Sequence, residues 1–257
     1  INVSNFTKCY GKLLAVNHIS FTVKKGEIFG FLGPNGAGKT TTINMLTGIT
    51  KPSSGTAFIS GFNVTSESIK AKELVGVVPQ VSFLYDEMSA WDNINFSAKL
   101  HGLPKMKRAS LAQELLRLFG LYERRNSRVG AFSGGMKKRL MIAIALIHEP
   151  QVLFLDEPTT GLDVESARQI RSLMRELNKK GTTIFLTTHY IEEADQLCQR
   201  IAIIDRGQIV TVDTPEGLKN TVKTENIIEV TFNPTNDLID HLKKLGSVKN
   251  VVTAGDK

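Results

Sequence analysis

Short apolar segments alternate with longer amphipathic ones along most of the chain. Residues 3–7 and 19–23 switch between apolar and polar positions, as half-buried strands do. Further short apolar runs of the kind that form strands lie at residues 28–32, 56–60, 74–78, 152–155, 183–187 and 201–205. Residues 164–180 carry their apolar side chains on one helical face. Strands that alternate with helices predict an α/β fold around a mostly parallel sheet.

Two parts of the chain depart from this alternation. From about residue 89 to residue 146 apolar side chains recur at helical spacing without a strand, which predicts an inserted α-helical subdomain. After residue 220 the pattern predicts a strand, a helix and a strand, at residues 227–232, 235–245 and 248–253. We therefore expect a main domain over residues 1–220 and a small C-terminal β-α-β domain over 221–257, and we expect this second domain to be cut short.

Charge is concentrated in one part of the chain. The formal net charge is +7, but residues 99–139 hold eleven Lys and Arg against only Glu114 and Glu123. A chain that binds nucleic acid along its surface would spread positive charge more evenly. Attraction to anionic lipid and a solvated helix face are both compatible with this basic stretch. Nucleic-acid binding ranks third, because no aromatic side chains are interleaved as stacking platforms.

The sequence carries no feature that would place it in a membrane or outside the cell. No apolar run approaches the roughly 18–20 residues that span a bilayer, and the first residues lack the basic and apolar regions of a signal peptide. Two cysteines, Cys9 and Cys198, cannot form a disulfide framework. We expect a soluble chain in a reducing compartment, which serves a membrane only through a partner.

A phosphate-binding loop is the strongest chemical signal. Gly33-x-x-x-x-Gly38-Lys39-Thr40 follows a predicted buried strand and opens a predicted helix, as such a loop requires. Its backbone N–H groups would surround phosphate oxygens, Lys39 would reach the β- and γ-phosphates, and the Thr40 hydroxyl would bind Mg²⁺. The expected ATP-binding residues are Gly33, Pro34, Asn35, Gly36, Ala37, Gly38, Lys39, Thr40 and Thr41.

A pair of acids follows the apolar run at residues 152–155. A buried strand that ends in Asp156 and Glu157 delivers both carboxylates to the carboxyl edge of the sheet, beside the phosphate-binding loop. Asp156 would hold Mg²⁺ through water. Glu157 would act as the general base on the attacking water, a role worth roughly 10²–10⁴ in rate.

The order of these motifs resembles the nucleotide-binding subunit of an ATP-binding-cassette (ABC) transporter. Phe132-Ser133-Gly134-Gly135-Met136, the signature segment, is similar to the Leu-Ser-Gly-Gly-Gln motif of that family, and two glycines and a serine at a helix start also suit an anion. The resemblance covers about residues 3–218. It implies a P-loop NTPase core of RecA-like type, with an N-terminal antiparallel β subdomain and the inserted helical subdomain.

The resemblance also assigns roles to single residues. Tyr10 would stack on adenine, Gln80 would bind Mg²⁺ and face the membrane partner, and His189 would contact the γ-phosphate beside Glu157. Ser133, Gly134, Gly135 and Met136 would close over the ATP of a second subunit. Asp163 would cross the same dimer interface, and it also suits the N-cap of the following helix. Met136 departs from the usual Gln and Phe132 from Leu, yet the Ser and Gly donors are intact, so hydrolysis is expected.

We therefore expect an ATPase with ATP and Mg²⁺ as cofactors, working on the cytoplasmic face of the cell membrane. Its partners would be a separate multi-span permease and a second copy of itself or a homologous subunit. Ser-Gly-Gly-Met and Thr187–Ala194 are most similar to the daunorubicin-resistance type, which implies export of a drug-like, lipid-like or polysaccharide compound. The alternative is a soluble ABC ATPase that acts on nucleic acid or ribosomes. A GTPase is disfavoured by the lack of an Asn-Lys-x-Asp motif.

Overall fold

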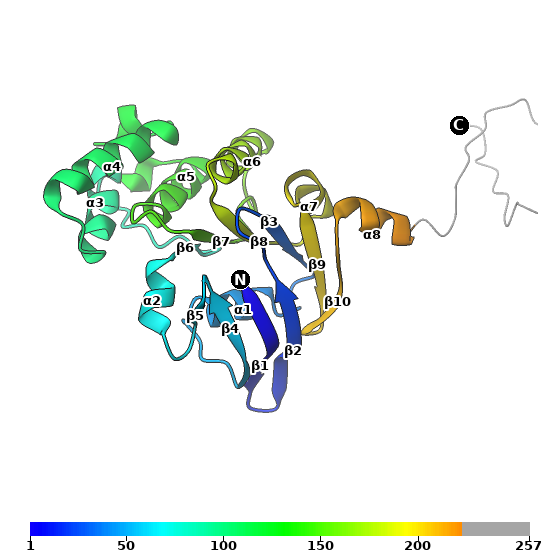
Figure 1. Cartoon of the computed structure of the whole chain (residues 1–257). Coiled ribbons are helices and arrows are strands. Elements are labelled where there is room, and N and C mark those ends of the chain that lie inside the picture. Colours follow the sequence, from blue (N-terminus) through cyan, green and yellow to red (C-terminus); the bar gives the residue numbers. More distant parts are fainter. Residues whose placement is uncertain (223–257) are drawn as a thin grey trace, which may run out of the picture. The chain divides into compact units, whose positions relative to one another are not determined.

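In the computed structural model, which describes residues 1–222, most of the apolar runs form a six-stranded sheet with the order β10-β9-β3-β8-β7-β6 (Figure 1). Its strands are β3 (Ile28–Leu32), β6 (Val75–Val78), β7 (Val152–Asp156), β8 (Thr183–Thr188), β9 (Arg200–Asp205) and β10 (Gln208–Asp213). Neighbouring strands are parallel except β9 and β10, which form an antiparallel hairpin. The mostly parallel sheet of the prediction is confirmed.

A second, antiparallel sheet is formed by the N-terminal strands, as the ABC resemblance implied. Its order is β2-β1-β4-β5, with bounds Leu13–Thr22, Asn2–Tyr10, Ser54–Ile59 and Phe62–Asn63. The predicted strand at residues 19–23 was too short, since β2 begins at Leu13, directly after the turn that contains Gly11. The predicted run at residues 56–60 began too late, since β4 already begins at Ser54. Gly55 is required there, because a Cβ would lie 2.1 Å from the Asn5 carbonyl oxygen.

The two sheets enclose a core that is rich in phenylalanine. Side chains alternate along β3, so that Phe29 and Phe31 face the antiparallel sheet while Ile28 and Leu32 face the helices on the other side. Phe185 of β8 packs against Phe29 and Phe31 with ring centroids 5.8 and 5.5 Å apart. This packing holds β3 and β8 in register, and both strands end at the edge where the chemistry is predicted.

The helices of the described part are α1 (Lys39–Leu46), α2 (Ser68–Glu73), α3 (Ala90–Leu100), α4 (Lys105–Leu118), α5 (Gly134–Ala145), α6 (Val164–Lys179), α7 (Ile191–Leu197) and α8 (Pro215–Val222). Helices α3, α4 and α5 form the predicted inserted subdomain, which Figure 1 shows in green beside β6 and β7. Gly102, at a φ of 72°, follows the end of α3. Single 3₁₀ turns lie at Tyr122–Arg124 and Val129–Ala131.

Four elements were not predicted, and each is short or lacks an apolar stripe. Helix α2 buries only Ala71, and α7 has seven residues. Strand β5 has two residues, and β10 is only half-buried. Residues 1–219 form one compact unit. The strands and helix predicted at residues 227–253 lie outside the described residues.

Candidate functional site

The loop between β3 and α1 forms a cradle of backbone N–H groups. Gly36 and Gly38 have φ values of 81° and 104°, which residues with a Cβ atom rarely adopt. Gly33 passes so close to β9 that a Cβ would lie 2.3 Å from the Ile204 carbonyl oxygen. Within residues 1–222 no side chain caps the N-terminus of α1. The first N–H groups of α1 are therefore available to an anion, and the helix dipole favours it.

Lys39 lies inside this cradle. Its side chain is buried, and Nζ donates to the carbonyl oxygens of Gly33 and Pro34 at 2.8 and 3.1 Å. Nζ also lies 3.2 Å from Oε1 of Glu157, which is buried as well. A buried ammonium group thus connects the loop to the acid that follows β7.

Two hydroxyl groups hold Asp156 at the end of β7. The Thr40 hydroxyl donates to Oδ2 at 2.9 Å, and the Thr187 hydroxyl donates to Oδ1. Hydroxyl and carboxylate oxygens next to a phosphate cradle are the ligands that Mg²⁺ prefers, and it takes one or two carboxylates together with substrate phosphates. Within the described residues no three His, Cys, Asp or Glu side chains form a metal cluster.

Glu157 has a constrained backbone and a crowded carboxylate. Its φ of 47° is uncommon for a residue other than glycine, and its N–H donates to the Thr187 backbone and side-chain oxygens. Oε2 accepts from the Thr160 hydroxyl at 3.1 Å and lies 3.2 Å from Nδ1 of His189, without an aligned hydrogen bond. Burial raises the pKa of Glu157, but Lys39 and then His189 outweigh it and hold that pKa below its usual value. The carboxylate is therefore ionised and able to accept a proton.

A pocket of about 690 Å³, the nucleotide pocket, opens on this edge of the sheet. It is lined by Tyr10, Leu13, Leu14, Ala15, Asn35, Gly36, Gly38, Lys39, Thr40, Thr41, Gln80, Glu157, Arg206 and Gly207. The structure thus brings the predicted Tyr10, Gln80, Glu157 and much of the loop together. Tyr10 is half-exposed at the end of β1, and the Lys8 ammonium lies 5.0 Å from its ring centroid.

The sequence analysis missed the other side of this pocket. Arg206 and Gly207 form the turn between β9 and β10, and residues 13–15 begin β2. Arg206-Gly207 follows the apolar run of β9 and precedes the alternating apolar and polar residues of β10. This pattern is a hairpin signal that could have predicted the turn. The Arg206 side chain is almost fully exposed and supplies a further positive charge at the rim.

The signature segment does not line the nucleotide pocket of its own chain. Ser133 caps α5 by accepting a hydrogen bond from the Met136 N–H at 3.3 Å. Gly135 packs against α6 so closely that a Cβ would lie 2.3 Å from Oγ of Ser166. Ser166 donates from its N–H and its hydroxyl to Asp163, which confirms the predicted N-cap of α6. Ser133, Gly134 and Asp163 are exposed.

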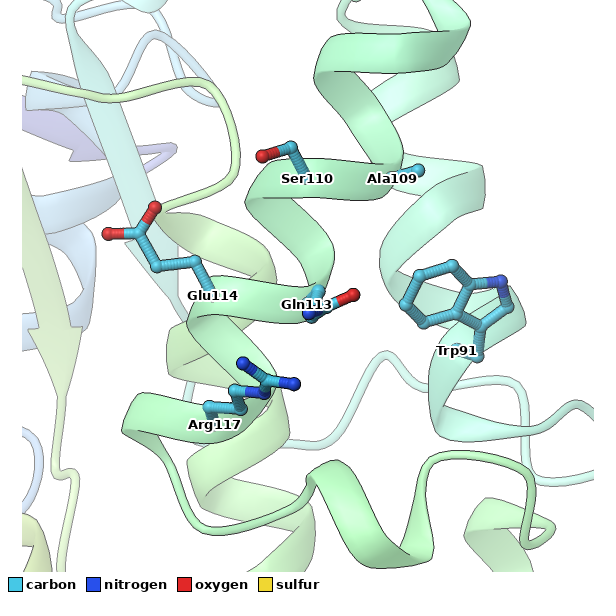
Figure 2. Close-up of a pocket in the computed structure, with 6 residues that line it drawn as sticks. All are labelled: Trp91, Ala109, Ser110, Gln113, Glu114 and Arg117. Atoms are coloured by element: carbon cyan, nitrogen blue, oxygen red, sulfur yellow. The ribbon is translucent and has the colours of Figure 1, made fainter.

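A second hollow of about 690 Å³ lies between α3 and α4 in the helical subdomain (Figure 2). It is lined by Trp91, Ala109, Ser110, Gln113, Glu114 and Arg117. None of its lining residues belongs to the phosphate cradle or to the pair of acids at the end of β7. The reaction site is therefore at the edge of the sheet and not in this hollow.

Comparisons with known proteins agree with this geometry. The family model described as "ABC transporter" matches residues 16–160. The linearmycin resistance ATP-binding protein LnrL of Bacillus subtilis is 40% identical over 252 residues, which cover 98% of this chain and 81% of that protein. The doxorubicin resistance ATP-binding protein DrrA of Mycobacterium tuberculosis is 40% identical over 248 residues, covering 96% and 75%.

Solved structures show the same fold. A dimeric ATP-binding cassette, MJ0796, in a post-hydrolysis state bound to ADP and Pi, is 26% identical with a TM-score of 0.75, over 83% of this chain and 98% of that one. In residues 1–222 no helix is long and apolar enough to cross a bilayer. The chain belongs to the ABC transporter family, as an ATP-binding subunit that hydrolyses ATP.

Proposed function

We propose that this chain drives export of a drug-like, lipid-like or polysaccharide compound through a separate multi-span permease, on the cytoplasmic face of the cell membrane. The observation that carries the proposal is the meeting of Lys39, Asp156, Glu157 and His189 at one edge of the sheet, where Lys39 and Glu157 line the nucleotide pocket. The names of the two relatives support drug-like substrates.

The proposed hydrolysis uses groups that already touch one another. Glu157 accepts a proton from water, the water oxygen bonds to the γ-phosphorus, and the bond from this phosphorus to the bridging oxygen of ADP breaks. His189, beside Oε2 of Glu157, orients the water and the γ-phosphate. The cradle N–H groups and Lys39 stabilise the charge that develops on the phosphate oxygens.

The metal requirement follows from the same residues. Thr40, Asp156 and Gln80 would hold Mg²⁺, with Asp156 acting through water, and bound Mg²⁺ supplies positive charge that neutralises the phosphates. A phosphate that approaches Lys39 also competes with Glu157 for its ammonium group. Weaker attraction from Lys39 lets the pKa of Glu157 rise, which makes this carboxylate a better base when ATP is present.

Completion of the site requires a second subunit, either another copy of this chain or a homologue. The nucleotide pocket of the same chain is not lined by the signature residues Ser133, Gly134, Gly135 and Met136 or by Asp163. Three of these residues are exposed: Ser133, Gly134 and Asp163. A serine hydroxyl and the N–H groups at the start of α5 suit the γ-phosphate of an ATP held by the opposite subunit. Two subunits would thus enclose two ATP molecules, with Tyr10 stacked on adenine.

Export is tested by accumulation of a fluorescent drug. Cells that produce this chain with its permease should retain less doxorubicin than cells that produce Glu157→Gln with the same permease, because only the first couples hydrolysis to transport. Uptake of doxorubicin is followed by cell fluorescence, with equal amounts of both proteins verified in the membrane fraction. Equal accumulation in the two strains would contradict export of this substrate class.

A further inference from the structure

A buried hydrogen bond joins the two segments that carry the proposed catalytic groups. The first segment leaves β7 with Glu157 and contains Thr159. The second leaves β8 with His189 and continues into α7, which contains Glu193. The Thr159 hydroxyl donates to Oε1 of Glu193 at 2.7 Å, and both side chains are buried, with exposures of 7% and 4%.

Glu193 is an unusual residue to bury. A carboxylate away from water is costly unless a cation or hydrogen bonds compensate for its lost hydration. Within residues 1–222 no Lys, Arg or His side chain lies within ion-pair distance of it, and its side-chain partner is the neutral Thr159 hydroxyl. Its place in the first turn of α7, where the helix dipole favours a negative charge, and the Thr159 hydroxyl compensate for the hydration it loses.

Thr159 lies in the tight turn that fixes the direction of Glu157. The Thr160 N–H donates to the Glu157 carbonyl oxygen, and the Leu162 N–H donates to that of Thr159, so the turn closes around Thr159. Glu157 keeps its positive φ only while its neighbours hold it there. The bond from Thr159 to α7 is the one side-chain hydrogen bond within the described residues that joins this turn to α7, whose N-cap is the neighbour of His189.

We propose that Thr159 and Glu193 are positioning residues for hydrolysis, which set the distance between Glu157 and His189 through their hydrogen bond. The two segments are then joined at both ends. At the sheet, the Thr187 oxygens accept from the Glu157 N–H, and farther out Glu193 accepts from Thr159. Movement of α7 alone would draw His189 away from Glu157. This inference rests on the proposed roles of Glu157 and His189.

Steady-state ATP hydrolysis by the full chain tests the inference. Thr159→Val removes the hydroxyl at nearly constant volume and should lower kcat about 10- to 100-fold, since small displacements of reacting groups have effects of this size. KM for ATP should stay within about twofold, because the cradle is not altered. Thr159→Ser restores the donor and should recover most of kcat. Glu193→Leu should lower kcat as much as Thr159→Val. The variant that carries both substitutions should have a kcat no lower than that of either single variant.

The matched control is Glu192→Gln, which neutralises the exposed neighbour of Glu193 and should leave kcat unchanged. ATP affinity of Thr159→Val near that of the unmodified chain shows that the variant is folded. A kcat of Thr159→Val within about twofold, no recovery by Thr159→Ser, or additive losses in the double variant would each overturn the inference. Full activity of Glu157→Gln would instead remove the proposed role of Glu157 itself.

Discussion

Replacing Glu157 by glutamine should lower the turnover number for ATP hydrolysis about 10²–10⁴-fold while ATP binding is retained. Glutamine has nearly the same shape but cannot accept the proton of the attacking water. The side chain faces Lys39 and His189 from the end of β7, so its loss removes the base without removing the cradle. Single-turnover measurement of phosphate release, at saturating ATP and Mg²⁺, gives the rate of the chemical step directly.

The control for this substitution is Glu165→Gln, which makes the same change on the exposed surface of α6. Its hydrolysis rate should equal that of the unmodified chain. If Glu157→Gln hydrolyses ATP at more than a tenth of the normal rate, another group accepts the proton, and the proposed mechanism is wrong.

Lys39→Ala should weaken binding of MgATP by about 2–5 kcal/mol, or roughly 30-fold to several thousand-fold in Kd, as expected when one partner of a buried charge pair is removed. The ammonium group is held inside the phosphate cradle by the carbonyl oxygens of Gly33 and Pro34, and alanine leaves the phosphates without this charge. Isothermal titration calorimetry with MgATP measures the effect. Hydrolysis at subsaturating ATP should fall at least as much.

Lys180→Ala is the matched control, because Lys180 lies on the exposed surface, where it forms an ion pair with Glu176. Its Kd for MgATP should be unchanged. A Kd of Lys39→Ala within threefold of the normal value would mean that the loop after β3 does not hold the phosphates.

The strand, loop and helix around Lys39 could be predicted because their signals are local. A buried apolar run, a glycine-rich loop and a helix start are contiguous in residues 28–46. Strand β3 has the predicted limits, and α1 begins at Lys39, at the end of the loop, as predicted. The acids after residue 155 were located by the same logic, since parallel strands present their carboxyl ends at one edge. The N-cap role of Asp163 was predicted from an equally local signal.

Contacts between distant segments could not be predicted in the same way. The order β3-β8-β7 puts Thr187 between the cradle and the two acids, where it bonds both Asp156 and Glu157. The hydrophobic pattern of β8 does not indicate that Thr187 lies beside these two acids. Lys138 belongs to a basic run, yet it is buried with Nζ near the Pro79 and Gln80 carbonyl oxygens. Charge counted along a sequence does not reveal which side chains the fold covers.

Light scattering after size-exclusion chromatography shows whether two copies of this chain pair to complete the site. Glu157→Gln, which should bind ATP without hydrolysing it, is measured with and without MgATP. We expect a monomer without ATP and a dimer with it, and the dimer should be lost when Ser133→Arg blocks the signature segment. A Glu157→Gln chain that binds MgATP yet stays monomeric at every concentration would contradict an ATP-driven pairing of two copies of this chain.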